Sequence, residues 1–546
     1  MTIRTICGGL TSRAFARRLL VLCCIAATLS LPACSAHPSH PSDAIVFNIG
    51  EDPHSLDPIL AQSDDERQIA HLMFDMLLDV DERGRLIPAL AMVVPSRANG
   101  GVSPDGRTIV YHIRQDVRWQ DGQPLTANDA IFTWQAITDP DNDVPSTRGY
   151  DLVDLIYAPD PWTLIVHLKR AWPPAVATLF TYGTNPMPIL PAHLLQERGN
   201  LRHLAFNTAP VGSGPYRLVR WERGDRLVFA ANPHYFRGAP KTATVVVSEV
   251  PDPNATLTLV REGALDWSLQ SPAQRIALGH VPTIRFDYAP FAGFGAIAFN
   301  CRRPPFDDVR MRRAFAMAID RQRLSQSITG GQYPVAQSDQ PTFSWAYDRS
   351  SQLPRFNPQA ADRELDALGW RRATDGVRRR DGRRLAVTFV TFPEGDTAVR
   401  TAEYVQAMLR DRGIDVAVKK VSVAQLYLPA HERGVLLSGR FDLAYITWRS
   451  GVDPDDADLV TCRGSANYAG FCDADVDSLE ARALSTPDTE IRRRAYAGVQ
   501  RALASSVPYD FLYAPRYGYA VQRGVRGFLP TPFSPTWNAY AWSKSR

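Results

Sequence analysis

The segment from Leu385 to Val421 constrains the fold most, because it predicts a strand, a helix and a second strand in succession. The stretches LAVTFVTF and IDVAVKKV are strand-like, and apolar residues recur between them at helical spacing, at Ala398, Ala402, Val405 and Leu409. Gly413 follows the last helical arginine, as a residue that ends a helix should. Two strands joined through a helix pair in parallel with a right-handed crossover. We therefore predict an α/β fold with a parallel sheet.

A further strand is predicted at the start of FDLAYITWRSGVDPDDAD, which runs from Phe441 to Asp458. Aromatic and β-branched residues crowd its first half, and Gly451 then breaks the pattern into an acidic turn. This strand can join the same sheet. Ligands of open α/β sheets bind beyond the carboxyl ends of the strands, which is where Trp448 to Asp453 fall. The alternative is a core strand followed by a solvated loop.

The acidic turn itself allows three interpretations. Asp453, Asp455 and Asp456 could form a carboxylate pair, a calcium-binding loop or a solvated turn. An EF-hand loop needs a glycine and a distal glutamate that are missing here, so the solvated turn is favoured. We predict no metal site and no cofactor.

The rest of the chain mixes strands and helices. Period-two patterns predict strands at 45–50, 105–118, 163–168, 214–231 (two strands), 243–250 and 294–300. Helical spacing predicts helices at 68–78, from near Asn128 after a capping Thr126, and at 308–324.

The N-terminus is typical of a secretion signal. Residues 1–33 combine basic residues with a short apolar run and are predicted to be a signal peptide. Leu31-Pro32-Ala33-Cys34 resembles the lipobox of bacterial lipoproteins, so we expect Cys34 to be lipidated and residues 34–43 to form a tether to the membrane. Because Pro32 is unusual in that motif, cleavage by an ordinary signal peptidase is the alternative.

The net charge excludes one class of partner. The 546-residue chain has a formal charge of +4, but the signal peptide contains four arginines and no acidic residue. Without it, the chain has 57 basic and 57 acidic residues. A neutral chain has no bias toward polyanions, so we expect no nucleic-acid partner.

Export also bears on the cysteines. An oxidising compartment favours a disulfide between Cys462 and Cys472, which lie close in sequence. Two zinc ligands are the alternative, but no nearby His or Cys completes a set of four. Cys301 is expected to be a buried free thiol.

Enzyme motifs are missing from the sequence. It contains no G-x-S-x-G elbow, HExxH, Walker A or dinucleotide fingerprint. We therefore predict that the chain is not an enzyme.

Several motifs, in order along the chain, are similar to one family. They are SLDP at 55–58, LMFDMLLDVDERGRLIPALA at 72–91, YHIRQDVRWQDGQPLTANDAIFTW at 111–134, PVGSGPYRLVRWERGDRLVFAANPHYFRG at 210–238, AFN followed by PPFDDVRMRRAFAMAIDR at 298–321, and FDLAYITW followed by DPD. Together they resemble the solute-binding proteins of bacterial ABC importers, in the oligopeptide, dipeptide and nickel-binding class (extracellular solute-binding protein family 5). Ser213 and Phe236 depart mildly from its pattern.

The resemblance implies a periplasmic binding protein of type II with an inserted third domain. Lobe I would comprise 44–80, 206–297 and 511–546, lobe II 81–205, and lobe III 298–510. Lobes I and III would close on a ligand about a hinge near Asn300 and Pro508–Tyr513. A monomer would capture a peptide or related small solute and deliver it to permease subunits with ATPases. Alternatives are a sensor or surface lipoprotein of the same fold, a metal-chelate binder, or a secreted hydrolase.

The resemblance also implies where the ligand binds. In the family's peptide binders, the aspartate of a W-x-x-D motif holds the peptide's α-ammonium group. The matching residues here are Trp448, Arg449, Ser450 and Gly451, so the carboxylate is missing. Asp453 could replace it, the ligand could lack a free amine, or Arg449 could favour an acidic ligand. The segment Gln62-Ser63-Asp64 is the other implied part of the cleft, and Asp64 could supply the missing charge.

Overall fold

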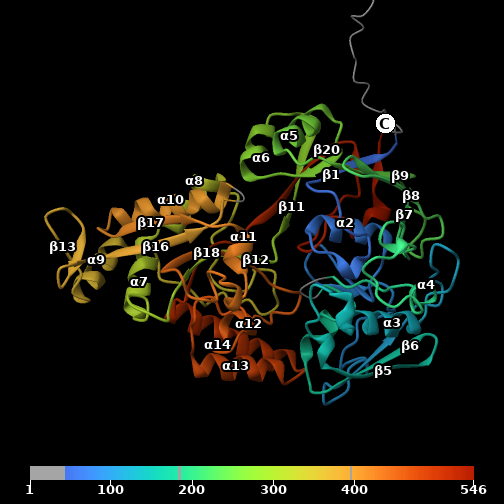
Figure 1. Cartoon of the computed structure of the whole chain (residues 1–546), viewed down its shortest axis with the longest axis horizontal. Helices are drawn as coiled ribbons and strands as arrows, with labels where there is room; N and C mark the ends of the chain where they lie inside the picture. Colours follow the sequence, from blue (N-terminus) through green and yellow to red (C-terminus); the bar gives the residue numbers. More distant parts are fainter. Residues whose placement is uncertain (1–42, 183–185, 394–395, 546) are drawn as a thin grey trace, which may run out of the picture. The chain divides into compact units, whose positions relative to one another are not determined.

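The computed structural model describes residues 43–182, 186–393 and 396–545, and its largest sheet has seven strands (Figure 1). In spatial order these are β11 (Ile284–Pro290), β20 (Arg516–Gln522), β10 (Trp267–Leu269), β1 (Ile45–Ile49), β9 (Thr244–Glu249), β8 (Arg226–Ala231) and β7 (Tyr216–Glu222). β1 pairs in parallel with β9 and β10, and the other pairs are antiparallel. The strands predicted at 45–50, 214–231 and 243–250 are confirmed.

The second sheet has five strands and contains the predicted strand–helix–strand unit. Its order is β17 (Asp415–Lys420), β16 (Ala386–Thr391), β18 (Leu443–Arg449), β12 (Gly293–Phe299) and β19 (Tyr509–Tyr513). β16 is parallel to both β17 and β18, and α10 (Asp396–Arg410) packs against β16 and β17, as predicted.

Strand β12 is buried along its whole length and is made mainly of small and aromatic residues. A side chain at Gly295 would lie 2.7 Å from the Tyr445 hydroxyl and 2.9 Å from the Tyr513 ring. The glycine therefore lets these two tyrosines approach, and their hydroxyls lie 3.0 Å apart in the core.

Two short connections join the two sheets. β11 leads into β12 through residues 291–292, and β19 leads into β20 through residues 514–515. The expected lobe boundaries at 297 and 511 fall inside β12 and β19. The division into three lobes and the hinge remain predictions, and these two connections are where a hinge between the sheets would lie.

A third, three-stranded sheet lies within residues 108–168. It consists of β4 (Thr108–His112), β6 (Thr163–Leu168) and β5 (Val153–Asp160), and it is covered by α3 (Ala127–Thr138), whose N-cap is Thr126 as predicted. Its buried side chains share one hydrophobic core with those of the seven-stranded sheet. A second hydrophobic core consists of residues between 294 and 513.

The remaining helices lie in the segments between the strands, and the short strands of the described residues form two pairs and one further three-stranded sheet. The helices are α4 (Ala192–Leu195), α5 (Pro253–Glu262), α6 (Pro272–Leu278), α9 (Pro358–Ala367), α11 (Val423–Tyr427), α12 (Ala457–Val460), α13 (Ala474–Leu484) and α14 (Thr489–Ser506). The small strands are β2 (Leu78–Val80), β3 (Leu86–Pro88), β13 (Arg371–Arg372), β14 (Arg378–Arg380), β15 (Arg383–Arg384), β21 (Val525–Arg526) and β22 (Ser543–Lys544).

Two helix predictions were wrong in their bounds, and capping side chains explain both. The helix expected at 308–324 is split into α7 (Val309–Ala318) and α8 (Arg321–Thr329), because Asp320 accepts a hydrogen bond from the Arg323 amide and caps a new helix. The helix expected at 68–78 is α2 (Asp64–Met73), which starts earlier because Ser63 and Glu66 form a capping box.

The predicted signal peptide at 1–33, Cys34 and the tether up to residue 42 lie outside the described residues. Among the residues that are described, no helix is long and apolar enough to cross a membrane.

Candidate functional site

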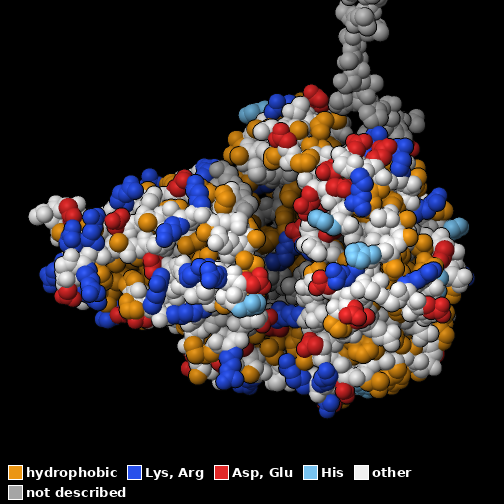
Figure 2. Space-filling model, in the orientation of Figure 1, with side chains coloured by type: hydrophobic (Ala, Val, Ile, Leu, Met, Phe, Trp, Pro, Cys, Tyr) orange, Lys and Arg blue, Asp and Glu red, His pale blue; other side chains and the backbone are white. Residues whose placement is uncertain are grey.

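Four cavities lie along the end of β18 and the residues that follow it. Each cavity is lined by at least one residue between 447 and 453. We name them after one lining residue: the Trp448 cavity (about 340 Å³), the Arg449 cavity (about 120 Å³), the Phe343 cavity (about 300 Å³) and the Gln270 cavity (about 540 Å³). Figure 2 shows a hollow in the molecular face with basic side chains inside it.

Arg449, at the end of β18, forms an ion pair with α2 and a hydrogen bond with the seven-stranded sheet. Its Nη2 lies 2.7 Å from Asp64 Oδ2 at the start of α2 and donates to the Tyr517 hydroxyl of β20 at 2.8 Å. The guanidinium also lies over the Phe291 ring. Burial raises the pKa of Asp64, but Arg449 and Arg67 outweigh burial and hold this pKa below its ordinary value. Both predicted residues, Asp64 and Arg449, line the Arg449 cavity.

Gln62 and Ser63, the neighbours of Asp64, stabilise the start of α2 and do not contribute to the walls of these cavities. Their backbone N–H groups donate to Glu66 Oε2 at 2.6 and 3.1 Å, and the Ser63 hydroxyl accepts from the Glu66 amide. Neither residue lines any of the four cavities. Ser63 thus caps the helix whose first residue is Asp64.

Trp448 and Ser450 both form hydrogen bonds with Asp456. The Trp448 indole donates to Asp456 Oδ1 at 2.7 Å, and the Ser450 hydroxyl donates to Asp456 Oδ2 at 3.3 Å. Trp448 and Gly451 line the Trp448 cavity, and Ser450 lines the Arg449 cavity. The strand end is therefore held against the acidic turn and does not extend freely into solvent.

The solvated-turn interpretation of the acidic turn is wrong. Asp453 lies 2.5 Å from Arg492, with both side chains about nine-tenths buried. Asp455 lies 2.9 Å from Arg148, and Asp456 is 1% exposed. These partners come from distant parts of the chain, so the local composition of the turn did not reveal its burial.

Burial also shifts the ionisation of this region. Burial raises the pKa of Asp456, and the nearby Asp339 carboxylate raises it further. Burial also raises the pKa of Asp339, to about 6. The Gln340 side chain donates to both carboxylates, at 3.1 and 3.0 Å, and so holds the two acids together.

Other residues of the site were missed by the sequence analysis. Arg148 and Trp172 line the Trp448 cavity, and Tyr517 lines the Arg449 cavity. Arg148 also forms an ion pair with Asp458 at 3.4 Å. Because these residues stand alone in the sequence, no local motif identifies them.

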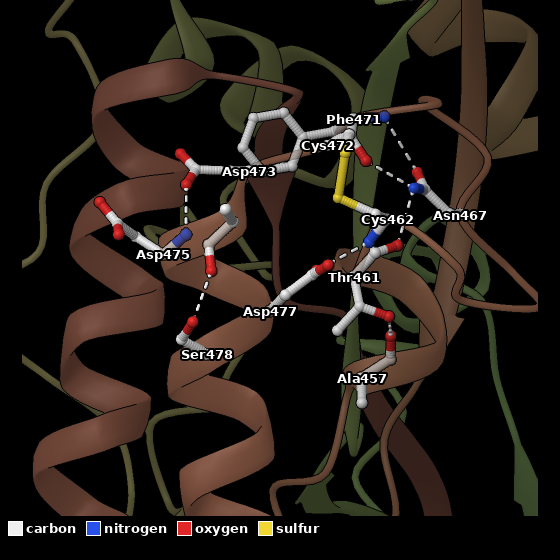
Figure 3. The surroundings of a disulfide bond; sticks show 11 residues. Ala457, Thr461, Cys462, Asn467, Phe471, Cys472, Asp473, Asp475, Asp477 and Ser478 are labelled. Atoms are coloured by element: carbon white, nitrogen blue, oxygen red, sulfur yellow. Dashed lines mark hydrogen bonds between the residues drawn. A yellow bond between two sulfur atoms is a disulfide. The ribbon is translucent and has the colours of Figure 1, made fainter.

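The disulfide between Cys462 and Cys472 is confirmed (Figure 3). It closes a loop after α12 that is also held by Asn467, whose amide donates to the carbonyl groups of Thr461 and Phe471. The Cys462 amide donates to Asp477 of α13 at 2.9 Å. Cys301 is a free thiol, but it is half-buried and not buried as expected.

Metal ligation receives no support from the described part of the chain. There, no group of three or more His, Cys, Asp or Glu side chains is placed to hold a metal ion.

Comparison with known families identifies the chain. The family model for bacterial extracellular solute-binding proteins, family 5, matches residues 86–470. The chain belongs to this family. This confirms the resemblance inferred from the ordered motifs, and it makes the chain a member of a family of solute-binding proteins.

Several named relatives in this family are peptide or ABC-transporter binding proteins. The oligopeptide-binding protein AppA of Bacillus subtilis is 24% identical over 518 residues, which cover 92% of each chain. The probable ABC transporter periplasmic-binding protein SapA of Escherichia coli is 27% identical over 490 residues, covering 85% of this chain and 86% of SapA.

Solved family structures share the fold. A complex of Bacillus subtilis AppA with a nonapeptide has a TM-score of 0.74 and 22% identity, and covers 92% of this chain and 99% of AppA. NikA of Brucella suis in complex with Fe(III)-EDTA has a TM-score of 0.80 and 20% identity, and covers 93% of this chain and 100% of NikA. The predicted α/β periplasmic-binding fold is therefore confirmed.

Proposed function

We propose that this family 5 protein is the peptide-binding component of an ABC importer. The observation that carries the proposal is that four cavities lie along residues 447–453, beside two sheets whose described strands are connected along the chain at two places, residues 291–292 and 514–515. A ligand that contacts both sheets favours the conformation in which they are close together. A permease with ATPases would recognise that conformation, and the protein would act without catalysis.

The structure favours Asp64 over Asp453 as the anchor for a ligand ammonium group. Gly451 carries no carboxylate, and Asp453 is nearly buried and paired with Arg492. The Asp64 side chain is 49% exposed and lines the Arg449 cavity, although it also pairs with Arg449 and Arg67. A peptide ammonium would bind Asp64 by competing with Arg449, and Trp448 would form the adjoining wall.

We propose that the chain is exported, that Cys34 anchors it to a membrane through lipid, and that it acts as a monomer beside the permease. A sensor of the same fold would bind the same ligand at the same site. Uptake of a labelled ligand by cells with and without the gene separates import from sensing.

Native mass spectrometry of mature protein, purified gently from its host, tests the ligand class. Denaturing release of short peptides is the expected result, and a single non-peptide species contradicts peptide import. The most abundant peptide is then synthesised with a free and an N-acetylated terminus. Weaker binding of the acetylated form is expected if Asp64 holds the ammonium group.

A further inference from the structure

The Gln270 cavity contains none of the eight residues that the sequence assigned to ligand binding. It lies beside both connections between the sheets, with Phe291 from one and Pro515 from the other in its wall. It shares Leu269 and Tyr517 with the Arg449 cavity. A ligand that starts beside Asp64 could therefore continue past these two side chains into it.

Two amide side chains in its wall, the buried Gln270 and the half-buried Asn48, each have a buried polar atom that is unpaired among the described residues. Gln270 is 2% exposed, and its Nε2 donates to the Ser268 hydroxyl at 3.0 Å. Its Oε1, like Asn48 Oδ1, has no hydrogen-bond partner among the described residues. In the alternative orientation of the Gln270 amide, with Oε1 and Nε2 exchanged, Nε2 would be the atom without a partner. A buried polar group without a partner is costly, so these atoms point to a polar group that is supplied from outside the chain.

The backbone holds Gln270 in this position. Its N–H donates to the Gly518 carbonyl at 2.9 Å, and its own carbonyl accepts from Arg275. Because it follows β10 directly, its place depends on the pairing of β10 with β20. A group fixed in this way before a ligand arrives loses little conformational freedom on binding.

The charge of the cavity differs from that of the Trp448 cavity. Arg516 is the one charged residue that lines it, whereas four aspartates line the Trp448 cavity. Arg516 is exposed, lies over the Tyr288 ring, and has no carboxylate partner among the described residues. The other walls are largely apolar, which is typical of ligand pockets with a few fixed polar groups. This environment suits neutral amides and one anionic end.

We propose that the Gln270 cavity binds the carboxyl-terminal part of a peptide whose ammonium group lies at Asp64. Gln270 and Asn48 pair with its backbone amides, and Arg516 pairs with its α-carboxylate. The inference rests on the proposed peptide-binding function and adds a polarity: the amino end lies at α2 and the carboxyl end at the Gln270 cavity.

The test starts from mature protein mixed with a casein hydrolysate of short peptides. The most enriched peptide is identified by mass spectrometry and synthesised with a free or an amidated carboxyl terminus, and titration calorimetry measures both. Amidation should weaken binding to the wild type about tenfold. Arg516→Gln should bind both forms equally and weakly, whereas Arg261→Gln, an exposed change on α5, should behave as the wild type.

A second variant tests the buried amide. Gln270→Met should weaken both forms of the peptide about tenfold, with Gln196→Met on the surface as the matched control and thermal unfolding as the check on folding. Equal affinity of the wild type for both forms would overturn the assignment of the Gln270 cavity, and so would an amidation effect that persists in Arg516→Gln. Neither result would contradict the proposed peptide-binding function. Failure of the wild type to retain any peptide overturns the proposed function as well.

Discussion

Arg449 Nη2 and Asp64 Oδ2 lie 2.7 Å apart although 385 residues separate them, and their ion pair links the end of β18 to the start of α2. Both side chains are partly exposed, at 36% and 49%. An exposed ion pair contributes at most about 1 kcal/mol to stability. The pair is therefore weak enough for a charged ligand to replace one of its members.

Replacing the Asp64 carboxylate should remove the preference for a free amino terminus. In Asp64→Asn, acetylation of the retained peptide should no longer change its affinity, whereas acetylation should weaken wild-type binding about tenfold. Titration calorimetry measures both. Asp381→Asn is the matched control, because the Asp381 side chain is 92% exposed in a distant turn. A preference that survives in Asp64→Asn excludes Asp64 as the anchor.

Breaking the Asp453–Arg492 pair should affect stability strongly. Arg492→Met leaves the nearly buried Asp453 carboxylate unpaired, and removing one partner of a buried pair costs about 3–5 kcal/mol. Urea unfolding measures the loss, with Arg261→Met as the surface control. A loss below about 1 kcal/mol would show that water reaches Asp453 and would restore it as a candidate anchor.

The buried acid Asp339 should make stability depend on pH. Burial raises its pKa from 3.8 to about 6, so the folded chain keeps a proton that the unfolded chain releases. The contribution of the protonated Asp339 side chain to the free energy of unfolding is full below about pH 4 and is lost as the pH rises through about 6. Asp339→Asn should therefore stabilise the protein by roughly 3 kcal/mol at pH 7 and have little effect at pH 4.

Urea unfolding of Asp339→Asn and the wild type at both pH values measures this difference. Asp381→Asn, at an exposed turn, should show no such pH dependence. An equal effect of Asp339→Asn at pH 4 and pH 7 would mean that the buried carboxylate does not titrate in this range.

The disulfide should stabilise the loop that follows β18. Removing the Cys462–Cys472 bond by a double change to serine should lower the free energy of unfolding by about 2–3 kcal/mol, because a short loop regains its freedom in the unfolded chain. Cys301→Ser is the control for loss of a free thiol. An unchanged denaturation midpoint would contradict a stabilising role for this bond.

Shortening Trp448 should weaken ligand binding. Trp448→Ala removes one wall of the Trp448 cavity and the hydrogen bond to Asp456, so we expect at least a tenfold loss of affinity for the retained peptide. Trp370→Ala, a change at an aromatic residue outside the four cavities, controls for general loss of packing. Unchanged binding to Trp448→Ala would move the site away from this wall.

Sequence patterns alone predicted the elements whose signals are local. The parallel pair β16 and β17 followed from periodicity around α10, and the disulfide followed from the spacing of two cysteines in an exported chain. Membership of the solute-binding family followed from the order of motifs along the chain. Such features depend on neighbours in sequence, so one sequence is enough to infer them.

The tertiary structure decided which side chains meet. Asp455 looked solvated because its sequence neighbours are polar, yet Arg148, which lies 307 residues away, neutralises it. The break at Asp320 was missed because one capping hydrogen bond outweighs continued helical spacing. Gln270 and Asn48 belong to no motif, and they share a cavity only because β1 and β10 are neighbours in one sheet. Burial and charge pairing arise between distant segments, so folding determines them and local sequence does not.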